Sequence, residues 1–476
     1  MKTQTSLNGQ AKSHAKVQIN SVESTYDNLS SRAGLALIMK YIEQTGILSR
    51  LSYKFQHFNR NSNGLQVPDF MKQIIACMID GSKLDLVVFD DLKQDAAYAI
   101  LIESEFSDLA SSHQIKRMFA KFQNNTRHTC IFRDIQTDIF ISHLRSTQPP
   151  VVVLGVDTMV MDNDQASQRE GCSPTYKKVK GFQPLQFYWN GMIIDSIFRE
   201  GKCHSNHGDD VKNSVQKLVK KIRKGYSETV PIILKMDSGF MSEENFQYFE
   251  ELGILYISAG RMYSSIKDYI GELPVANRNE YVGTKQTWDY IEFGNKLDSW
   301  DKFRRAIYLQ QTSTDTGQLV LDFAKSDRII YTNIGINTEL SAIAAKALGK
   351  DICCPRYIIK EFHNRAQDEL CNRGFKDFVA RENLPFKGFA QNQAFYYLLA
   401  ISMQLLQSYV RDICFDVFSS KSYPTTMRRQ LIDFAGKFVS HSRKITLKVS
   451  ALVFKQYKIN LLWERCLYHK RKIAYI

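Results

Sequence analysis

The stretch LQFYWNGMIIDSIF, residues 185–198, indicates how the central part of the chain folds. Two apolar, strand-like runs meet at Asn190-Gly191, and this dipeptide is the strongest short signal for a two-residue hairpin turn. We therefore expect a β-hairpin here, with its turn at Asn190-Gly191.

The segments on either side of the hairpin extend this prediction. The run VVVLGVDTMVM, residues 151–161, is β-branched and apolar and indicates a buried strand. After the hairpin, the helical pattern of residues 209–225 leads to VPIILKM, residues 230–236, a second buried strand. The order of strand, hairpin, helix and strand predicts an α/β fold with a ribonuclease-H-like core.

Composition divides the rest of the chain into further regions. Residues 1–28 are polar and lack periodicity, which predicts a flexible basic arm. Apolar residues at three-and-four spacing predict a helical, DNA-binding domain over 29–148. The ribonuclease-H-like domain is expected over 149–400, with a β-rich insertion at about 262–335, and a basic helical C-terminal region over 401–476.

The charge balance favours a polyanionic partner. Lysine and arginine number 63 against 49 aspartates and glutamates, a formal net charge of +14. Nucleic acid is the first candidate, and a membrane surface is the alternative. The chain contains no apolar run of 18 or more residues, and its nine cysteines form no CxxC pair. We expect a soluble, cytoplasmic protein with reduced thiols.

Two aspartates stand where predicted strands would place a binding site. Asp157 interrupts an apolar strand, and an ionised carboxylate in such a position is costly unless it binds a cation or accepts hydrogen bonds. Asp237 directly follows VPIILKM, at the carboxyl end of a predicted strand, where open α/β sheets bind their ligands. For each aspartate alone, the alternative is a strand-end residue that caps a turn.

A third group of charges lies in FHNRAQDELCNRGFK, residues 362–376. In one continuous helix, Arg365, Glu369 and Lys376 would share a face, since they fall within about 40° of one another around the axis. The alternative is a solvated face with one Arg/Glu pair. Asp157, Asp237 and Glu369 together would form an all-oxygen site suited to Mg²⁺ or Mn²⁺, with two ions acting on a phosphodiester.

These segments resemble the catalytic signatures of DDE transposases of bacterial insertion sequences. The resemblance lies in GVDTMVMDND around Asp157, LKMDSGF around Asp237, and the spacing F-x2-R-x3-E-x6-K. The third motif is similar to the Tyr-Arg-Glu-Lys signature of the group that has a β-rich insertion before the glutamate. Here Phe362 replaces the signature tyrosine, so the ring is kept and the hydroxyl is lost.

The resemblance implies a function and a set of roles. Asp157, Asp237 and Glu369 would be the catalytic metal ligands, and Arg365, Lys376 and Phe362 would contact DNA phosphates. The protein would cut and paste an insertion sequence, bind its terminal inverted repeats and target DNA, act as a homodimer, and associate with the bacterial nucleoid. The alternatives are a metal-dependent nuclease on the same fold and a transposase-derived DNA-binding protein without catalysis.

Two tryptophans in the predicted insertion are candidates for a different contact. Trp288 and Trp300 could stack on a base that leaves the DNA helix. The alternative is that both rings belong to the hydrophobic core.

Overall fold

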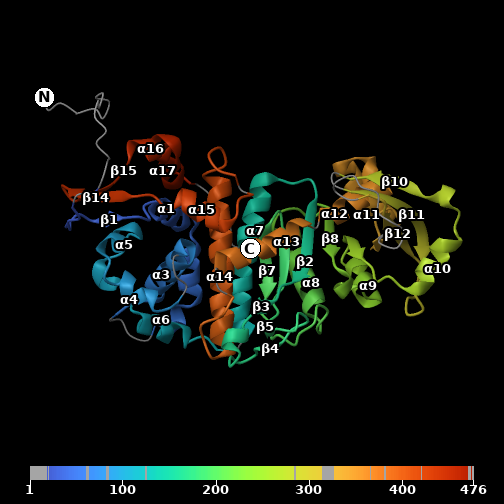
Figure 1. The fold of residues 1–476 in the computed structure, drawn as a ribbon, viewed down its shortest axis with the longest axis horizontal. Coiled ribbons are helices and arrows are strands. Elements are labelled where there is room, and N and C mark those ends of the chain that lie inside the picture. Colours follow the sequence, from blue (N-terminus) through green and yellow to red (C-terminus); the bar gives the residue numbers. More distant parts are fainter. Residues whose placement is uncertain are drawn as a thin grey trace.

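A mixed β-sheet crosses the centre of the molecule in the computed structural model (Figure 1). The structure describes residues 19, 21–59, 64–81, 85–123, 126–283, 286–313, 326–364, 366–379, 382–419, 421–469 and 473. In these residues the sheet has nine strands, in the order β10 (Asn279–Val282), β11 (Thr287–Asn295), β12 (Arg304–Gln311), β13 (Asp327–Thr332), β9 (Leu255–Ala259), β8 (Ile232–Met236), β2 (Val152–Thr158), β6 (Leu185–Trp189) and β7 (Met192–Ile197).

The predicted hairpin forms the β6–β7 end of this sheet. Trp189 pairs with Met192 across the turn, and Asn190 and Gly191 both have positive φ, 46° and 73°. That geometry fits a type I′ turn, so the prediction from residues 185–198 is confirmed. The predicted order is also confirmed, because β2 is followed by this hairpin, by helix α8 (Asp210–Gly225) and by β8.

Strands β2, β8 and β9 run parallel, and the other pairings in the sheet are antiparallel. Their side chains alternate between two cores. Ile232 and Leu234 pack with α7 (Thr126–Thr147), α8 and α9 (Glu243–Glu251), whereas Ile233 faces α11 (Thr338–Leu348) and α12 (Pro355–His363). Apolar residues therefore occupy successive positions, because both faces of the parallel strands are covered.

The predicted N-terminal helices pack around a long C-terminal one. Helix α14 (Phe389–Asp412) is buried on nearly all sides and lies beside α7 in the middle of the molecule (Figure 1). Around it are α1 (Leu35–Thr45), α2 (Ile47–Lys54), α3 (Val67–Asp80), α4 (Val88–Leu92), α5 (Ala96–Leu101) and α6 (Ser112–Phe119). The expected boundary at residues 400 and 401 thus falls inside one continuous helix.

The C-terminal region is not wholly helical. It contains α15 (Pro424–Leu431), α16 (Ala451–Gln456) and α17 (Ile459–Leu467), but also the hairpin β14 (Gly436–His441) and β15 (Lys444–Val449). Strand β1 (Leu29–Ser30) pairs with β14, so this sheet joins segments from both ends of the chain. The helical expectation for residues 401–476 was wrong at this hairpin, where Phe438 and Leu447 form a cross-strand pair that packs against the helical core.

The β-rich insertion continues the central sheet. Strand β13 pairs with β9, and β12, β11 and β10 follow outward, after α10 (Ser264–Glu272). Residues 284–285 and 314–325 of this region lie outside the described residues. A separate three-stranded sheet is formed by β3 (Met161–Asp162), β5 (Lys180–Phe182) and β4 (Ser173–Pro174).

The charged segment 362–376 is not a single helix. Helix α12 ends at His363, and α13 (Ala366–Val379) begins three residues later. Phe362 therefore lies on one helix and Glu369 and Lys376 on the next, while Arg365 lies outside the described residues. Glu369 and Lys376, seven residues apart on α13, lie near one face of that helix, and the place of Arg365 on the same face stays a prediction.

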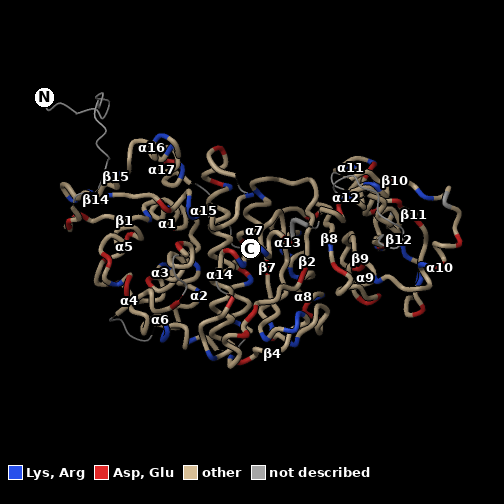
Figure 2. Tube along the Cα trace, viewed as in Figure 1, with Lys and Arg blue, Asp and Glu red and all other residues tan. Residues whose placement is uncertain are grey.

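Charge is distributed along the whole trace. Figure 2 shows basic and acidic residues interspersed over most of the chain, so the net charge of +14 is not gathered in one segment. Among the described residues, no helix is both long and apolar enough to cross a bilayer.

Candidate active site

Asp157 and Asp237 occupy corresponding positions on neighbouring parallel strands. Val152 pairs with Ile232 and Gly155 with Lys235, so the register of β2 and β8 is a constant offset. Continued by two residues, this register would bring Asp157 opposite Asp237, at the strand spacing of about 4.8 Å. The two aspartates therefore lie together at the carboxyl ends of adjacent strands.

Both aspartates accept hydrogen bonds from the backbone that follows them. The amide of Thr158 donates to Asp157 Oδ1 at 2.8 Å, and the amide of Ser238 donates to Asp237 Oδ1 at 2.5 Å. Each side chain is partly exposed and lines a large cleft. One oxygen of each carboxylate is thus held by the backbone, which limits how either side chain can turn.

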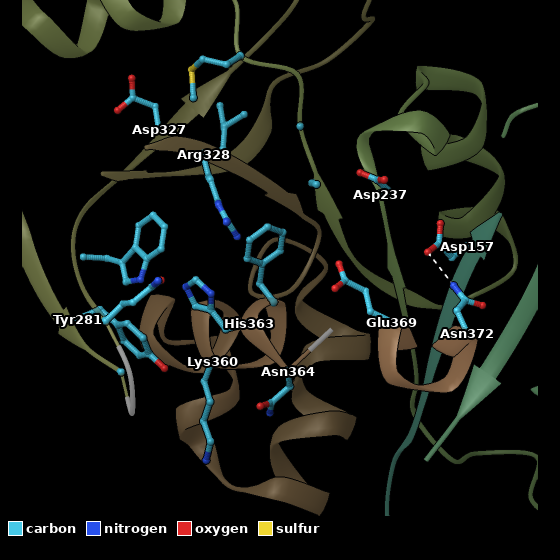
Figure 3. A pocket seen from close by; sticks show the side chains of 18 of the residues that line it. Asp157, Asp237, Tyr281, Asp327, Arg328, Lys360, His363, Asn364, Glu369 and Asn372 are labelled. Atoms are coloured by element: carbon cyan, nitrogen blue, oxygen red, sulfur yellow. Dashed lines mark hydrogen bonds between the residues drawn. The ribbon is translucent and has the colours of Figure 1, made fainter. Parts of the chain in front are cut away.

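Glu369 reaches the same cleft from α13. Its side chain is exposed and lines the cleft with Asp157 and Asp237. Figure 3 shows Glu369 directed toward the space beside the two aspartates. Among the residues that the structure describes, no three His, Cys, Asp or Glu side chains lie close enough to hold a metal ion. Glu369 therefore shares the cleft with the two aspartates without closing a three-carboxylate cluster.

Asn372 links α13 to Asp157. Its Nδ2 donates to Asp157 Oδ2 at 3.4 Å (Figure 3), and its Oδ1 accepts a hydrogen bond from the hydroxyl of Tyr188 on β6. An ionised carboxylate only accepts hydrogen bonds, so the NH₂ group of Asn372 must face Asp157 and its amide oxygen faces Tyr188. The same hydroxyl lies 2.8 Å from Gln186 Oε1, so its single proton serves one of the two acceptors at a time. The sequence signal was available, since Asn372 follows Glu369 by three residues and shares its helix face, but sequence reasoning did not single it out.

Lys376 also lines the cleft, but it is already paired. Its Nζ donates to both carboxylate oxygens of Glu382, at 2.9 and 2.8 Å. Glu382 in turn accepts the backbone N–H of Asp162 at 2.8 Å. Lys376 is therefore not an uncommitted cation, and sequence reasoning missed Glu382 because it lies beyond the signature.

Tyr176 is a further cleft residue that the sequence did not indicate. Partial desolvation, followed by the charges of Asp157 and Asp237, raises the pKa of its hydroxyl above the ordinary value. The phenol thus lies within electrostatic reach of both aspartates. Its ring is 61 % exposed, so it can contact a bound ligand.

An aromatic wall closes the side of the cleft nearest the insertion. Trp288 is buried, with the guanidinium of Arg328 5.1 Å from its ring centre and His363 at 5.1 Å. The ring of Tyr281 also stacks on His363, with 6.0 Å between the ring centroids. Desolvation, aided by the positive charge of Arg328, lowers the pKa of His363 to about 4, so the imidazole is neutral at neutral pH.

The remaining signature residues have different surroundings. Phe362 lines the cleft and packs in part against the core beneath α12. Trp300 is buried against Phe246, Tyr331 and the guanidinium of Arg304. This position matches the alternative to base stacking, in which the ring belongs to the hydrophobic core. Trp288 lines the cleft, but a base could stack on it only if Arg328 moved away, so that contact stays a prediction.

The cleft is lined by charges of both signs, because Asp327 and Asp351 lie in its lining besides the three candidate carboxylates. The cleft, with a volume of about 1790 Å³, is lined by Lys177, Arg328, Arg356, Lys360, Arg373 and Lys376. Carboxylate oxygens are the ligands that Mg²⁺ and Mn²⁺ prefer, so the donor chemistry of Asp157, Asp237 and Glu369 fits a divalent cation. Basic side chains around such a centre suit a ligand that carries phosphates.

The fold and the site thus define a mixed α/β protein with paired strand-end carboxylates in a cleft that is also lined by six cations. The chain belongs to the family described as "Transposase DDE domain group 1", whose sequence model matches residues 11–467. No curated protein matches the chain. A structure titled "Cryo-EM structure of piggyBac transposase synaptic complex with hairpin DNA (SNHP)" is 11% identical, over 84% of this chain and 80% of that one. Its TM-score is 0.39, so this likeness carries no argument about the present chain.

Proposed function

We propose that this member of the DDE transposase family catalyses cut-and-paste transposition of a bacterial insertion sequence. The observation that carries the proposal is the position of Asp157 and Asp237 at corresponding places on parallel strands, inside a cleft lined by six cations. The expected substrates are the terminal inverted repeats of the element and its target DNA. We expect a ribonuclease-H-like catalytic core and a homodimer that pairs two element ends in the cytoplasm, at the nucleoid.

Asp157, Asp237 and Glu369 would hold Mg²⁺ or Mn²⁺, as the pair of ions that such reactions use. When bound, these cations supply an activated nucleophile and neutralise charge on the leaving oxygen.

The protein's own residues then have separable tasks. Asp157 and Asp237 are oriented by backbone amides, and Asn372 holds the second oxygen of Asp157. Cleft cations such as Lys360 and Arg373 would bind phosphates on either side of the scissile bond. Arg365 and Phe362 remain candidate phosphate contacts, and Lys376 would have to leave Glu382 to make one.

The test is cleavage and joining of duplex DNA that carries the sequences flanking the gene, with Mg²⁺. Asp157→Asn, Asp237→Asn and Glu369→Gln should each abolish cleavage and leave DNA binding largely intact, because binding comes mainly from phosphate contacts. Asp268→Asn is the matched control, since Asp268 is exposed on α10. Normal cleavage by Asp237→Asn would remove the assignment.

The same assay separates the two alternatives. Cleavage of the ends without their transfer to target DNA would identify a metal-dependent nuclease. Sequence-dependent binding without cleavage by the unaltered chain would identify a DNA-binding protein that has lost catalysis.

A further inference from the structure

The hairpin β14–β15 has one inward and one outward face. Phe438 is buried, and its cross-strand partner Leu447 packs with it against the helical core. Because side chains alternate along a strand, the neighbouring pairs must point the other way. These pairs are Lys437 with Lys448, Val439 with Thr446, and His441 with Lys444.

The outward face and its turn carry an excess of positive charge. Four basic side chains, of Lys437, Arg443, Lys444 and Lys448, are exposed there beside His441, and residues 436–449 contain no aspartate or glutamate. In the described part of the chain, Lys437 alone among the four pairs with a carboxylate, that of Asp27 at 2.8 Å. Lys437 and Lys448 lie directly opposite each other, and Asp27 relieves part of their repulsion by pairing with Lys437.

The turn of this hairpin contains a charged residue at a position whose backbone conformation other residues adopt more easily. Ser442 and Arg443 both have positive φ, 51° and 63°, in a two-residue loop. The other two-residue hairpin of this chain uses Asn190-Gly191 at similar angles, the residues that adopt them most easily. At the tip of β14–β15 the chain instead has an arginine in a conformation that favours glycine.

We propose that this basic face, made of Lys437, His441, Arg443, Lys444 and Lys448, binds the backbone phosphates of double-stranded DNA. The inference rests on the proposed function in taking DNA as the ligand. Figure 1 places β14 and β15 at the opposite end of the molecule from β10–β12 and well away from β2 and β8. The hairpin therefore contacts DNA at a distance from the strand that is cut, and it adds affinity rather than base recognition.

The experiment measures DNA binding by the full chain in an Asp237→Asn background, so that no DNA is cut. Affinity for a fluorescent duplex is followed by anisotropy as NaCl is raised. The test variant is Arg443→Gln/Lys444→Gln/Lys448→Gln. Its plot of log K against log salt should be less steep by about 0.9 for each lost phosphate contact, or about 2.7 in total. Its affinity near physiological salt should be at least roughly tenfold lower. The control is Lys93→Gln/Lys220→Gln/Lys224→Gln, which removes the same charge from exposed residues elsewhere.

A second variant separates binding from folding. Ser442→Asn/Arg443→Gly gives the turn its preferred residues, so the melting temperature should stay equal or rise, whereas DNA affinity should fall. Lys444→Arg/Lys448→Arg keeps the charge and should bind normally.

Three results would overturn the proposal. One is an unchanged salt dependence of DNA binding in Arg443→Gln/Lys444→Gln/Lys448→Gln. Another is an equal loss of DNA affinity in the control variant. A third is a changed oligomeric state with unchanged DNA binding, which would make the face a contact between protein chains. If the Asp237→Asn chain with an intact hairpin bound no DNA at low salt, the proposed function itself would fail.

Discussion

Asn372 on α13 donates a hydrogen bond to Asp157 on β2, with 3.4 Å between Nδ2 and Oδ2. Glu369 lies three residues earlier on the same helix, so this contact connects the helix of the third carboxylate to the strand of the first. Tyr188, on the next strand, holds the amide from its other side. The contact with Asn372 therefore adds to the core packing of Phe375 and Phe378 in positioning α13 beside Asp157.

Replacing Asn372 should impair catalysis more than folding. Asn372→Ala should lower the rate of end cleavage by about 10 to 100-fold and raise the Mg²⁺ concentration needed for half-maximal rate, as loss of a group that orients a metal ligand does. DNA binding should be unchanged. Asn213→Ala, at an exposed position of α8, is the control. An unaltered Mg²⁺ dependence would show that the contact with Asp157 is incidental.

The pairing of Lys376 with Glu382 predicts an increase in affinity on mutation. Glu382→Gln removes the charge that holds Lys376 but keeps an oxygen for the backbone N–H of Asp162. If Lys376 binds a phosphate, DNA affinity should rise a few-fold, while the free energy of unfolding falls by no more than about 1 kcal/mol.

The matched control for this change is Glu244→Gln, which removes one of the two carboxylates that pair with Lys212, away from the cleft. Anisotropy titrations compare the two variants. The same affinity in Glu382→Gln and the unaltered chain would argue that Lys376 only stabilises the α13 region.

His363 should make the protein sensitive to acid. Its pKa is lowered to about 4, against an ordinary value of 6.5, so below pH 6.5 the unfolded chain binds a proton that the native chain does not. This residue's contribution to stability is therefore lost as pH falls from about 6.5 to about 4. Thermal melting across that range should show a shallower decline in His363→Gln. The exposed His441→Gln should follow the unaltered chain, and identical curves for all three proteins would contradict the prediction.

Arg428 joins the ends of two helices in the core. Its guanidinium is buried and donates to the carbonyls of Met78 and Ile79 on α3, at 2.7 and 2.8 Å, and of Phe378 on α13 at 3.0 Å. A lysine cannot form this fork, so Arg428→Lys should lower the free energy of unfolding by about 2 to 4 kcal/mol.

Denaturant unfolding measures the effect of that substitution, with the exposed neighbour Arg429→Lys as the control. Equal midpoints for Arg428→Lys and Arg429→Lys would show that α13 is held by other contacts.

Local patterns in the sequence were sufficient for many of the secondary elements, though not for the β14–β15 hairpin, and for two candidate residues. Asn190-Gly191 determines its own turn, because its residues tolerate positive φ without help from distant contacts. The apolar runs ending at Asp157 and Asp237 likewise predict strands whose last positions are polar. Their neighbouring location follows from the preference for parallel pairing in α/β folds, and β2 and β8 confirm that pairing.

Other features depend on segments far apart in the chain. The contact of Asn372 with Asp157 joins residues 215 positions apart, and the backbone N–H of Asp162 donates to Glu382, 220 positions later. The break between α12 and α13, the continuation of the insertion into the central sheet, and the inward burial of Trp300 all arise from packing against distant elements. Periodicity reports which face of an element is apolar, but not which partner covers that face, and the partner determines the geometry of the cleft.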